Sequence, residues 1–147
     1  MKIYLGHPAN LYFGHPVNTY DTPLERDLIF AIYEKFLDSS IENPNQPHHA
    51  EGYKRWTEET GRGMSYFYEE VLPLCNGGVF LPFRDGKWGA GVIAEARWLA
   101  ERDLPTWEIN SLGSAIELDA LNQEARTLSV DETRARIRTA SGELLPY

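Results

Sequence analysis

Residues 11–25, LYFGHPVNTYDTPLE, contain the junction that decides the fold. The opening aromatic and aliphatic trio favours a β-strand, and Pro16, which has no N–H for a sheet ladder, ends it. Thr22 then supplies a helix N-cap, Pro23 takes the first helical position, and Glu25 stands three residues after the cap. Apolar residues recur beyond this start at a spacing near 3.6: Leu24, Leu28, Ile32 and Phe36, with Ile29, Tyr33 and Leu37. The stretch predicts a strand, a loop and a helix of an α/β unit.

The same phrase occurs twice, as IYLGHPAN at residues 3–10 and LYFGHPVN at residues 11–18. Only the second copy leads into the helix start, so we predict that Leu11 to Phe13 form a central strand. Ile3 to Leu5 should lie at an edge or outside the main sheet. The first copy is then a tandem duplication, an added edge strand, or a remnant of a protease-recognition tag that lacks its Gln. We expect a structural role for His7.

The rest of the chain alternates strand and helix signals. They predict a loop over 39–50 after a short strand near Ile41, two helical pieces within 51–74 separated by Gly61-Arg62-Gly63, a strand at 77–83, a helix at 89–101 and a strand at 105–109. A strand over 115–121 and a capped helix from Ser129 to about Thr139 form a C-terminal extension. This order predicts a single α/β domain over residues 1–147. Its sheet should be mainly parallel (flavodoxin-like or Rossmann-like), with helices on both faces.

Composition excludes several classes of protein. The chain has 147 residues, with 14 Lys and Arg against 22 Asp and Glu, and this acidic balance argues against a nucleic-acid partner. Cys75 is the single cysteine, so an internal disulfide is impossible. No apolar run reaches the roughly 20 residues that span a bilayer. We therefore expect a cytoplasmic protein with no membrane partner.

Candidate binding residues gather where strands should end. In open α/β sheets, ligands bind beyond the carboxyl ends of the strands. His15, Pro16, Asn18 and Tyr20 follow the first strand. A second group lies at the start of the helix predicted over 89–101. It consists of Trp88 and of Gly89 and Gly91, two small residues that let a ligand approach the backbone.

Three segments together resemble the nucleoside 2-deoxyribosyltransferase family: LYFGHP with its capped helix, GGVFLPF, and GKWGAGVIAEARWLAERDLPTWEI, within residues 11–109. The resemblance implies a nucleoside or nucleotide as the small-molecule partner, and Glu95 matches the family's nucleophilic Glu. Glu95 stands four residues after Gly91, where the family often has two, and Asn76 replaces a common Asp. The resemblance also implies a homo-oligomer, with the C-terminal Tyr147 near a pocket.

Cleavage of an N-glycosidic bond explains why carboxyl groups are wanted. A carboxylate attacks or stabilises the positive anomeric carbon while an acid protonates the departing base. We expect Glu95, near a helix N-terminus, to be kept ionised by the helix field, and Asp85 or Glu69 to serve as the acid. The alternatives are that Glu95 is an exposed acid of a first helical turn and that Asp85 is a turn-former beside Gly86.

The remaining candidates are aromatic or histidine residues. Tyr68 belongs to an aromatic cluster that stacks on a base or fills the core. For His48 and His49 we expect no metal, because adjacent His residues seldom point the same way and no Cys or acidic partner has ligand spacing nearby. We expect no cofactor. The leading hypothesis is an enzyme acting on the N-glycosidic bond by transfer or hydrolysis. The alternatives are a non-catalytic binding protein for a nucleotide or ADP-ribose-like signal and an interaction domain without a small ligand.

Overall fold

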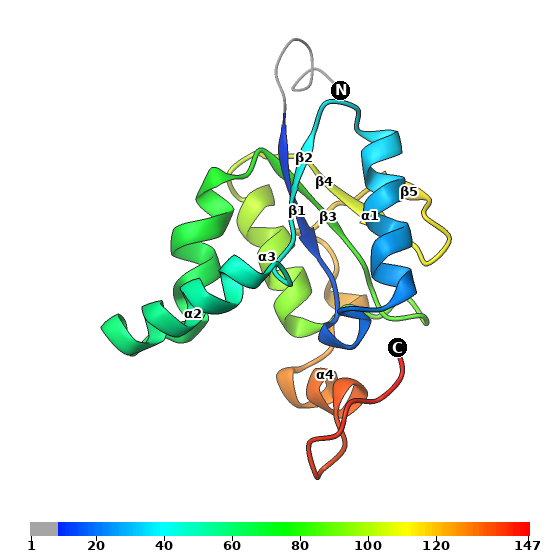
Figure 1. The fold of residues 1–147 in the computed structure, drawn as a ribbon. Coiled ribbons are helices and arrows are strands. Elements are labelled where there is room, and N and C mark those ends of the chain that lie inside the picture. Colours follow the sequence, from blue (N-terminus) through cyan, green and yellow to red (C-terminus); the bar gives the residue numbers. More distant parts are fainter. Residues whose placement is uncertain (1–8) are drawn as a thin grey trace.

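A five-stranded sheet with the order β2-β1-β3-β4-β5 forms the centre of the computed structural model, which describes residues 9–147 (Figure 1). The strands are β1 (Asn10–Gly14), β2 (Ser40–Glu42), β3 (Gly77–Phe80), β4 (Thr106–Ile109) and β5 (Ala115–Glu117). The first four are parallel, and β5 runs antiparallel to β4. The predicted single-domain α/β fold with a mainly parallel sheet is confirmed.

The strand from the second copy of the repeated phrase is interior, as predicted. Leu11 of β1 is in register with Ile41 on one side and with Gly77 on the other. The predicted positions of Ile3 to Leu5 and the role of His7 lie outside the described residues. The chain thus passes from β1 to one neighbour and later to the other, which makes the carboxyl ends of β1 and β3 a topological switch point.

Residues 9–147 contain four α-helices. They are α1 (Pro23–Lys35), α2 (Pro47–Thr60), α3 (Ala90–Ala100) and α4 (Val130–Ile137). The Thr22 hydroxyl accepts the N–H of Glu25 at the start of α1, and Ser129 forms a capping box with Glu132 at the start of α4. Gly61, at φ +71°, ends α2 in the left-handed conformation that glycine tolerates. Residues 63–74 form short 3-10 and π-helical turns instead of the second regular helix that we predicted.

Alternation along the strands divides the core into two layers. Leu11 and Phe13 face α1 and pack in one buried cluster with Leu28 and Ile32. Tyr12 points to the opposite face, where its buried cluster includes residues of α3 and of the 63–74 segment. Figure 1 shows α1 on one side of the sheet and α2 and α3 on the other. Helices therefore cover both faces, because each face of the sheet is apolar.

One prediction of burial and one predicted boundary were wrong. Tyr33 and Leu37, part of the predicted apolar stripe, are 46% and 71% exposed, because α1 turns Leu28 and Ile32, with the partly buried Leu24 and Ile29, toward the sheet. The loop predicted over 39–50 is shorter, since Pro47 starts α2. Pro is favourable at the first turn of a helix, where its missing N–H has no partner to lose.

The C-terminal part of the chain lies beyond the carboxyl ends of the parallel strands, where Figure 1 shows α4. The predicted strand at 115–121 ends at Glu117. Trp88 anchors the following segment: its N–H donates to the carbonyl of Arg126 and its carbonyl accepts the N–H of Leu128. This anchoring brings α4 against the N-terminus of α3, where the N–H of Ala90 donates to the Thr133 hydroxyl at 2.9 Å.

Candidate functional site

A pocket of about 200 Å³ opens at the switch point between β1 and β3. Six of the residues predicted from the sequence line it: His15, Pro16, Tyr20, Gly89, Gly91 and Glu95. Aromatic and aliphatic side chains complete the wall: Tyr12, Val17, Pro44, Phe67, Phe83, Val92 and Ile137, with Thr133. The pocket therefore has an apolar lining and few polar groups, the usual character of a small-molecule site.

A carboxyl–tyrosine pair is the most polar feature of this pocket. The Tyr12 hydroxyl donates to Oε2 of Glu95 across 2.6 Å. Tyr12 belongs to β1, and Glu95 is the sixth residue of α3 and is itself half-buried. The pair exists because strand alternation turns Tyr12 away from its neighbours Leu11 and Phe13 and toward α3. We did not predict Tyr12 as a site residue from the sequence. The alternation of side chains along a strand, which places Tyr12 on the opposite face from Leu11 and Phe13, could have indicated it.

Burial raises the pKa of the Glu95 carboxyl to about 8, against the lowering effect of the Tyr12 hydrogen bond. The expectation that the helix field keeps Glu95 ionised is wrong in direction. Glu95 lies beyond the first turn of α3, and the field of a helix terminus falls off within that turn. Loss of hydration, which disfavours the charged carboxylate, then dominates. Near neutral pH the carboxyl group is mostly protonated.

Two further tyrosines lie within electrostatic reach of Glu95. Burial, followed by the Glu95 charge, raises the pKa of Tyr20 well above its usual range and that of Tyr68 to about 12. Both phenols therefore remain protonated at physiological pH. Tyr20 lines the pocket, whereas Tyr68 lines an adjoining groove. The site offers hydroxyl donors around one carboxyl group.

His15 is held by its neighbours and presents its ring to the pocket. Its Nδ1 is paired with the Thr19 hydroxyl at 2.6 Å and its Nε2 with Oδ1 of Asn43 at 2.9 Å. The ring stacks on Phe13 with centroids 4.1 Å apart. Burial lowers the pKa of His15 to about 4, against the raising effects of Asn43 and Glu25. Near neutral pH the imidazole is thus neutral, with both ring nitrogens occupied, so its role toward a ligand is packing.

The loop after β2 is tied to α1 by a buried carboxylate that we did not predict as part of the site. Glu25 accepts hydrogen bonds from the side-chain amides of Asn43 and Asn45 at distances of 3.1 to 3.3 Å. It also accepts the N–H of Asp21. These contacts fix the loop that carries Pro44 to the pocket wall.

The structure does not bring the two candidate acids to the pocket. Asp85 forms a two-point ion pair with Arg136, with both N···O distances 2.8 Å. The Arg136 guanidinium is the main cause that lowers the pKa of Asp85 to about 2. Glu69 is exposed and lies 3.4 Å from Arg62. Neither carboxyl group lines the cavity, and each is engaged by an arginine elsewhere.

Three other predicted binding residues do not line the pocket. Trp88 is fully buried, and its indole N–H donates to Gln123. The Asn18 amide donates to the carbonyls of Arg136 and Leu145, which ties the loop after β1 to the C-terminal segment. Tyr147 stacks on the pocket residue Phe83 and donates its hydroxyl to the Pro82 carbonyl at 2.5 Å. The C-terminal tyrosine therefore lies one ring away from the pocket of its own chain.

A larger apolar groove of about 520 Å³ continues from the pocket between α3 and α4. Val17, Gly91, Thr133 and Ile137 line both. Tyr68 and the guanidinium-bearing Arg134 and Arg138 line the groove only. The combined space admits a ligand with one small part beside Glu95 and one larger apolar part in the groove.

No family model, no curated protein and no solved structure matches this chain. Among residues 9–147, no helix has both the length and the apolar character needed to cross a bilayer. The class of protein that the fold defines is a single α/β domain with a pocket at the switch point of its sheet. Its function has to be argued from the chemistry of that pocket.

Proposed function

We propose that this protein is an enzyme that cleaves or transfers at the N-glycosidic bond of a nucleoside or nucleotide, with Glu95 as the nucleophile. The observation that carries the proposal is a single carboxyl group, hydrogen-bonded to Tyr12, in an apolar pocket at the carboxyl ends of β1 and β3. The sugar occupies the pocket of about 200 Å³, and the base extends into the adjoining groove.

The proposed reaction needs the ionised form of Glu95. One carboxylate oxygen attacks the anomeric carbon, a C–O ester bond forms, the C–N bond breaks, and its electron pair leaves with the base. No second carboxyl group lines the pocket within residues 9–147, so solvent supplies the proton that the base takes up. Water or a second base then displaces Glu95 and restores the free carboxylate. The Tyr12 hydroxyl orients the attacking group throughout.

A pKa of about 8 sets the pH dependence of this reaction. Below that value the nucleophile is mostly protonated, so kcat/KM should rise about tenfold per pH unit and level off above pH 8. A fall of kcat/KM through the same range would instead assign Glu95 the role of general acid.

A second function is favoured by the same protonation state. At neutral pH a protonated Glu95 donates a hydrogen bond to a ligand rather than attacking it. The alternative proposal is a non-catalytic binding protein for a nucleotide or an ADP-ribose-like signal molecule.

The decisive experiment incubates the protein with a panel of nucleosides and their monophosphates and detects free base by chromatography. The enzyme proposal expects release by wild type, loss in Glu95→Gln, and full activity in Glu101→Gln, which removes an exposed carboxylate at the end of the same helix. Saturable binding without turnover, retained in Glu95→Gln, would select the binding protein. Neither release nor binding would contradict both.

Three finer assignments belong to this proposal. The strand order β2-β1-β3-β4-β5 supports a flavodoxin-like sheet with a C-terminal strand–helix extension. The antiparallel direction of β5 differs from the flavodoxin-like pattern. The lone cysteine supports a cytoplasmic location. We also propose a homo-oligomer, supported by the exposed apolar Leu144 and by Val130, which lines the groove, and sedimentation tests it.

A further inference from the structure

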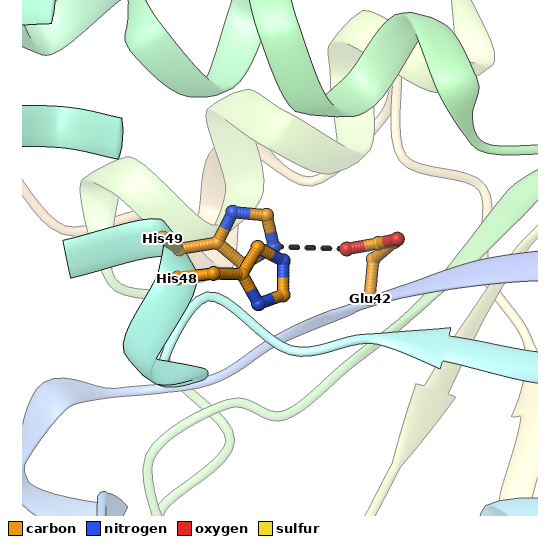
Figure 2. Close-up of side chains that lie close together, drawn as sticks. All are labelled: Glu42, His48 and His49. Carbon is orange, nitrogen blue, oxygen red and sulfur yellow. Dashed lines mark hydrogen bonds and ion pairs between the residues drawn. The ribbon is translucent and has the colours of Figure 1, made fainter. Parts of the chain in front are cut away.

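A histidine–carboxylate cluster lies outside the Glu95 pocket, where β2 leads into α2. Its members are Glu42, the last residue of β2, and His48 and His49 in the first turn of α2. One ligand atom from each lies within 4.8 Å of the others. Figure 2 shows the two imidazole rings side by side with the Glu42 carboxylate opposite them. From the sequence we expected no acidic partner for the histidines. Glu42 comes close to them because the chain turns between the end of β2 and the start of α2, and the sequence spacing does not show this turn.

The donor set is that of a divalent transition-metal site. Two imidazole nitrogens and one carboxylate oxygen suit zinc and its neighbours, whereas magnesium and calcium take oxygen ligands. Bonds of about 2.0 to 2.1 Å in a tetrahedral site imply ligand atoms about 3.3 Å apart. The cluster is compatible with that value: Nε2 of His49 lies 2.8 Å from Oε2 of Glu42, and the three ligand atoms all lie within 4.8 Å of one another. His48 is exposed, so its ring is free to complete the contact.

Two neighbouring side chains hold the other ligands in position. Nδ1 of His49 is 3.1 Å from the Tyr66 hydroxyl, which directs Nε2 of this buried ring toward Glu42. Asn10 donates to Oε1 of Glu42 at 3.5 Å and leaves Oε2 facing the histidine. A partner on the second ring nitrogen is typical of metal-binding histidines, because it fixes the tautomer and the ring orientation.

Charge decides whether a cation is tolerated there. The N-terminus of α2 carries the positive end of a helix dipole, which works against a cation. The Glu42 carboxylate offsets this within the cluster, and the net charge of −8 favours cations over the whole chain.

We propose that Glu42, His48 and His49 bind one divalent transition-metal ion, with water at the remaining position. The ion would tie the end of β2 to the start of α2 and so fix the loop between them, which carries Asn43 and Pro44. Asn43 holds His15, and Pro44 lines the Glu95 pocket. The metal therefore stiffens one wall of the pocket and takes no part in the proposed reaction.

The test is calorimetric titration of the tag-free, chelator-treated protein with zinc chloride. We expect one ion per chain, an affinity at least tenfold weaker in His48→Ala and in Glu42→Gln, and unchanged binding in the control Glu58→Gln, which removes an exposed carboxylate farther along α2. Cobalt(II) should give the visible absorption of a tetrahedral site, absent in His48→Ala. Because His48 is exposed, its replacement leaves the fold intact, which circular dichroism checks.

Three outcomes would overturn the proposal. They are an absence of saturable zinc binding, equal binding by wild type and His48→Ala, and displacement of zinc by millimolar magnesium. Each would leave the His49–Glu42 contact as an ordinary hydrogen bond. None bears on the Glu95 reaction, which is measured separately.

Discussion

Replacement of Glu95 by Gln should make the folded protein markedly less sensitive to alkaline pH. In wild type the pKa of Glu95 rises from an ordinary 4.5 to about 8 on folding, chiefly through burial. Between these values the unfolded chain has released a proton that the folded chain keeps. The stability contributed by the protonated carboxyl is complete below pH 4.5 and is lost as pH rises toward 8.

The rise of the Glu95 pKa from 4.5 to about 8 sets an upper limit of about 5 kcal/mol on this loss of stability, at roughly 1.4 kcal/mol per pKa unit. Glu95 lines a pocket and is only half-buried, so water screens part of the effect. We therefore expect wild type to lose about 2 to 3 kcal/mol between pH 5 and pH 8 through this group. The glutamine side chain of the Glu95→Gln variant is never charged, and its amide oxygen still accepts from Tyr12. The variant should therefore lack this component.

Urea denaturation at pH 5, 6.5 and 8 measures the difference. The stability of wild type relative to Glu95→Gln should fall steadily across the series. Glu101→Gln, which removes an exposed carboxylate of the same helix end, should follow wild type. Parallel pH dependences for wild type and Glu95→Gln would refute the reasoning, because they would mean that Glu95 titrates alike in both states. This test needs no knowledge of the substrate.

Four other predictions concern packing, an exposed ion pair and a buried thiol. Gly77→Ala should destabilise the fold by about 2 kcal/mol in urea melts, since an added Cβ would meet the Pro105 carbonyl oxygen at 2.7 Å. Gly91→Ala, in α3 with nothing within 4 Å of the added Cβ, should instead stabilise it by about 0.5 to 1 kcal/mol; the reverse order would contradict this packing. Asp85→Asn should lower the free energy of unfolding by at most about 0.5 kcal/mol above pH 4 and not at all below pH 2, because the lowered pKa of Asp85 stems from an exposed ion pair with Arg136. A loss of base release in this variant would mean that Asp85 reaches the substrate. Cys75, buried and with a pKa raised to about 12, should react with a thiol reagent at pH 8 only after unfolding; rapid labelling of the native protein would contradict its burial.

Local signals were enough to predict most of the fold. Thr22, Pro23 and Ser129 mark helix starts that the structure keeps, because capping depends on residues within one helical turn. The strand at Leu11 to Phe13 was also predictable, because only that copy of the repeated phrase precedes a helix start. The irregular turns of 63–74 were not, since tertiary packing overrides the weak helix preference of that segment.

The candidate site was predictable as a region but not as a set of contacts. The carboxyl ends of β1 and β3 meet in the pocket, which follows from strand order, and His15 and Glu95 were placed there in advance. The pairing of Tyr12 with Glu95 spans 83 residues and depends on which face of β1 packs on α3. Asp85 has a suitable position in the chain, yet Arg136, 51 residues away, engages it. Such long-range pairings depend on geometry that no local pattern contains.

The environment of Glu95 argues for function rather than for stability. A buried carboxyl group that served the fold would be expected to have a cationic partner, as Glu108 has Arg126 in this chain. Within residues 9–147, the hydrogen-bond partner of Glu95 is instead the Tyr12 phenol, and burial shifts its pKa against folding at alkaline pH. An apolar side chain at this position would avoid that loss. A costly ionisable group at the lining of a pocket is the arrangement expected when its chemistry, and not its packing, is what the protein uses.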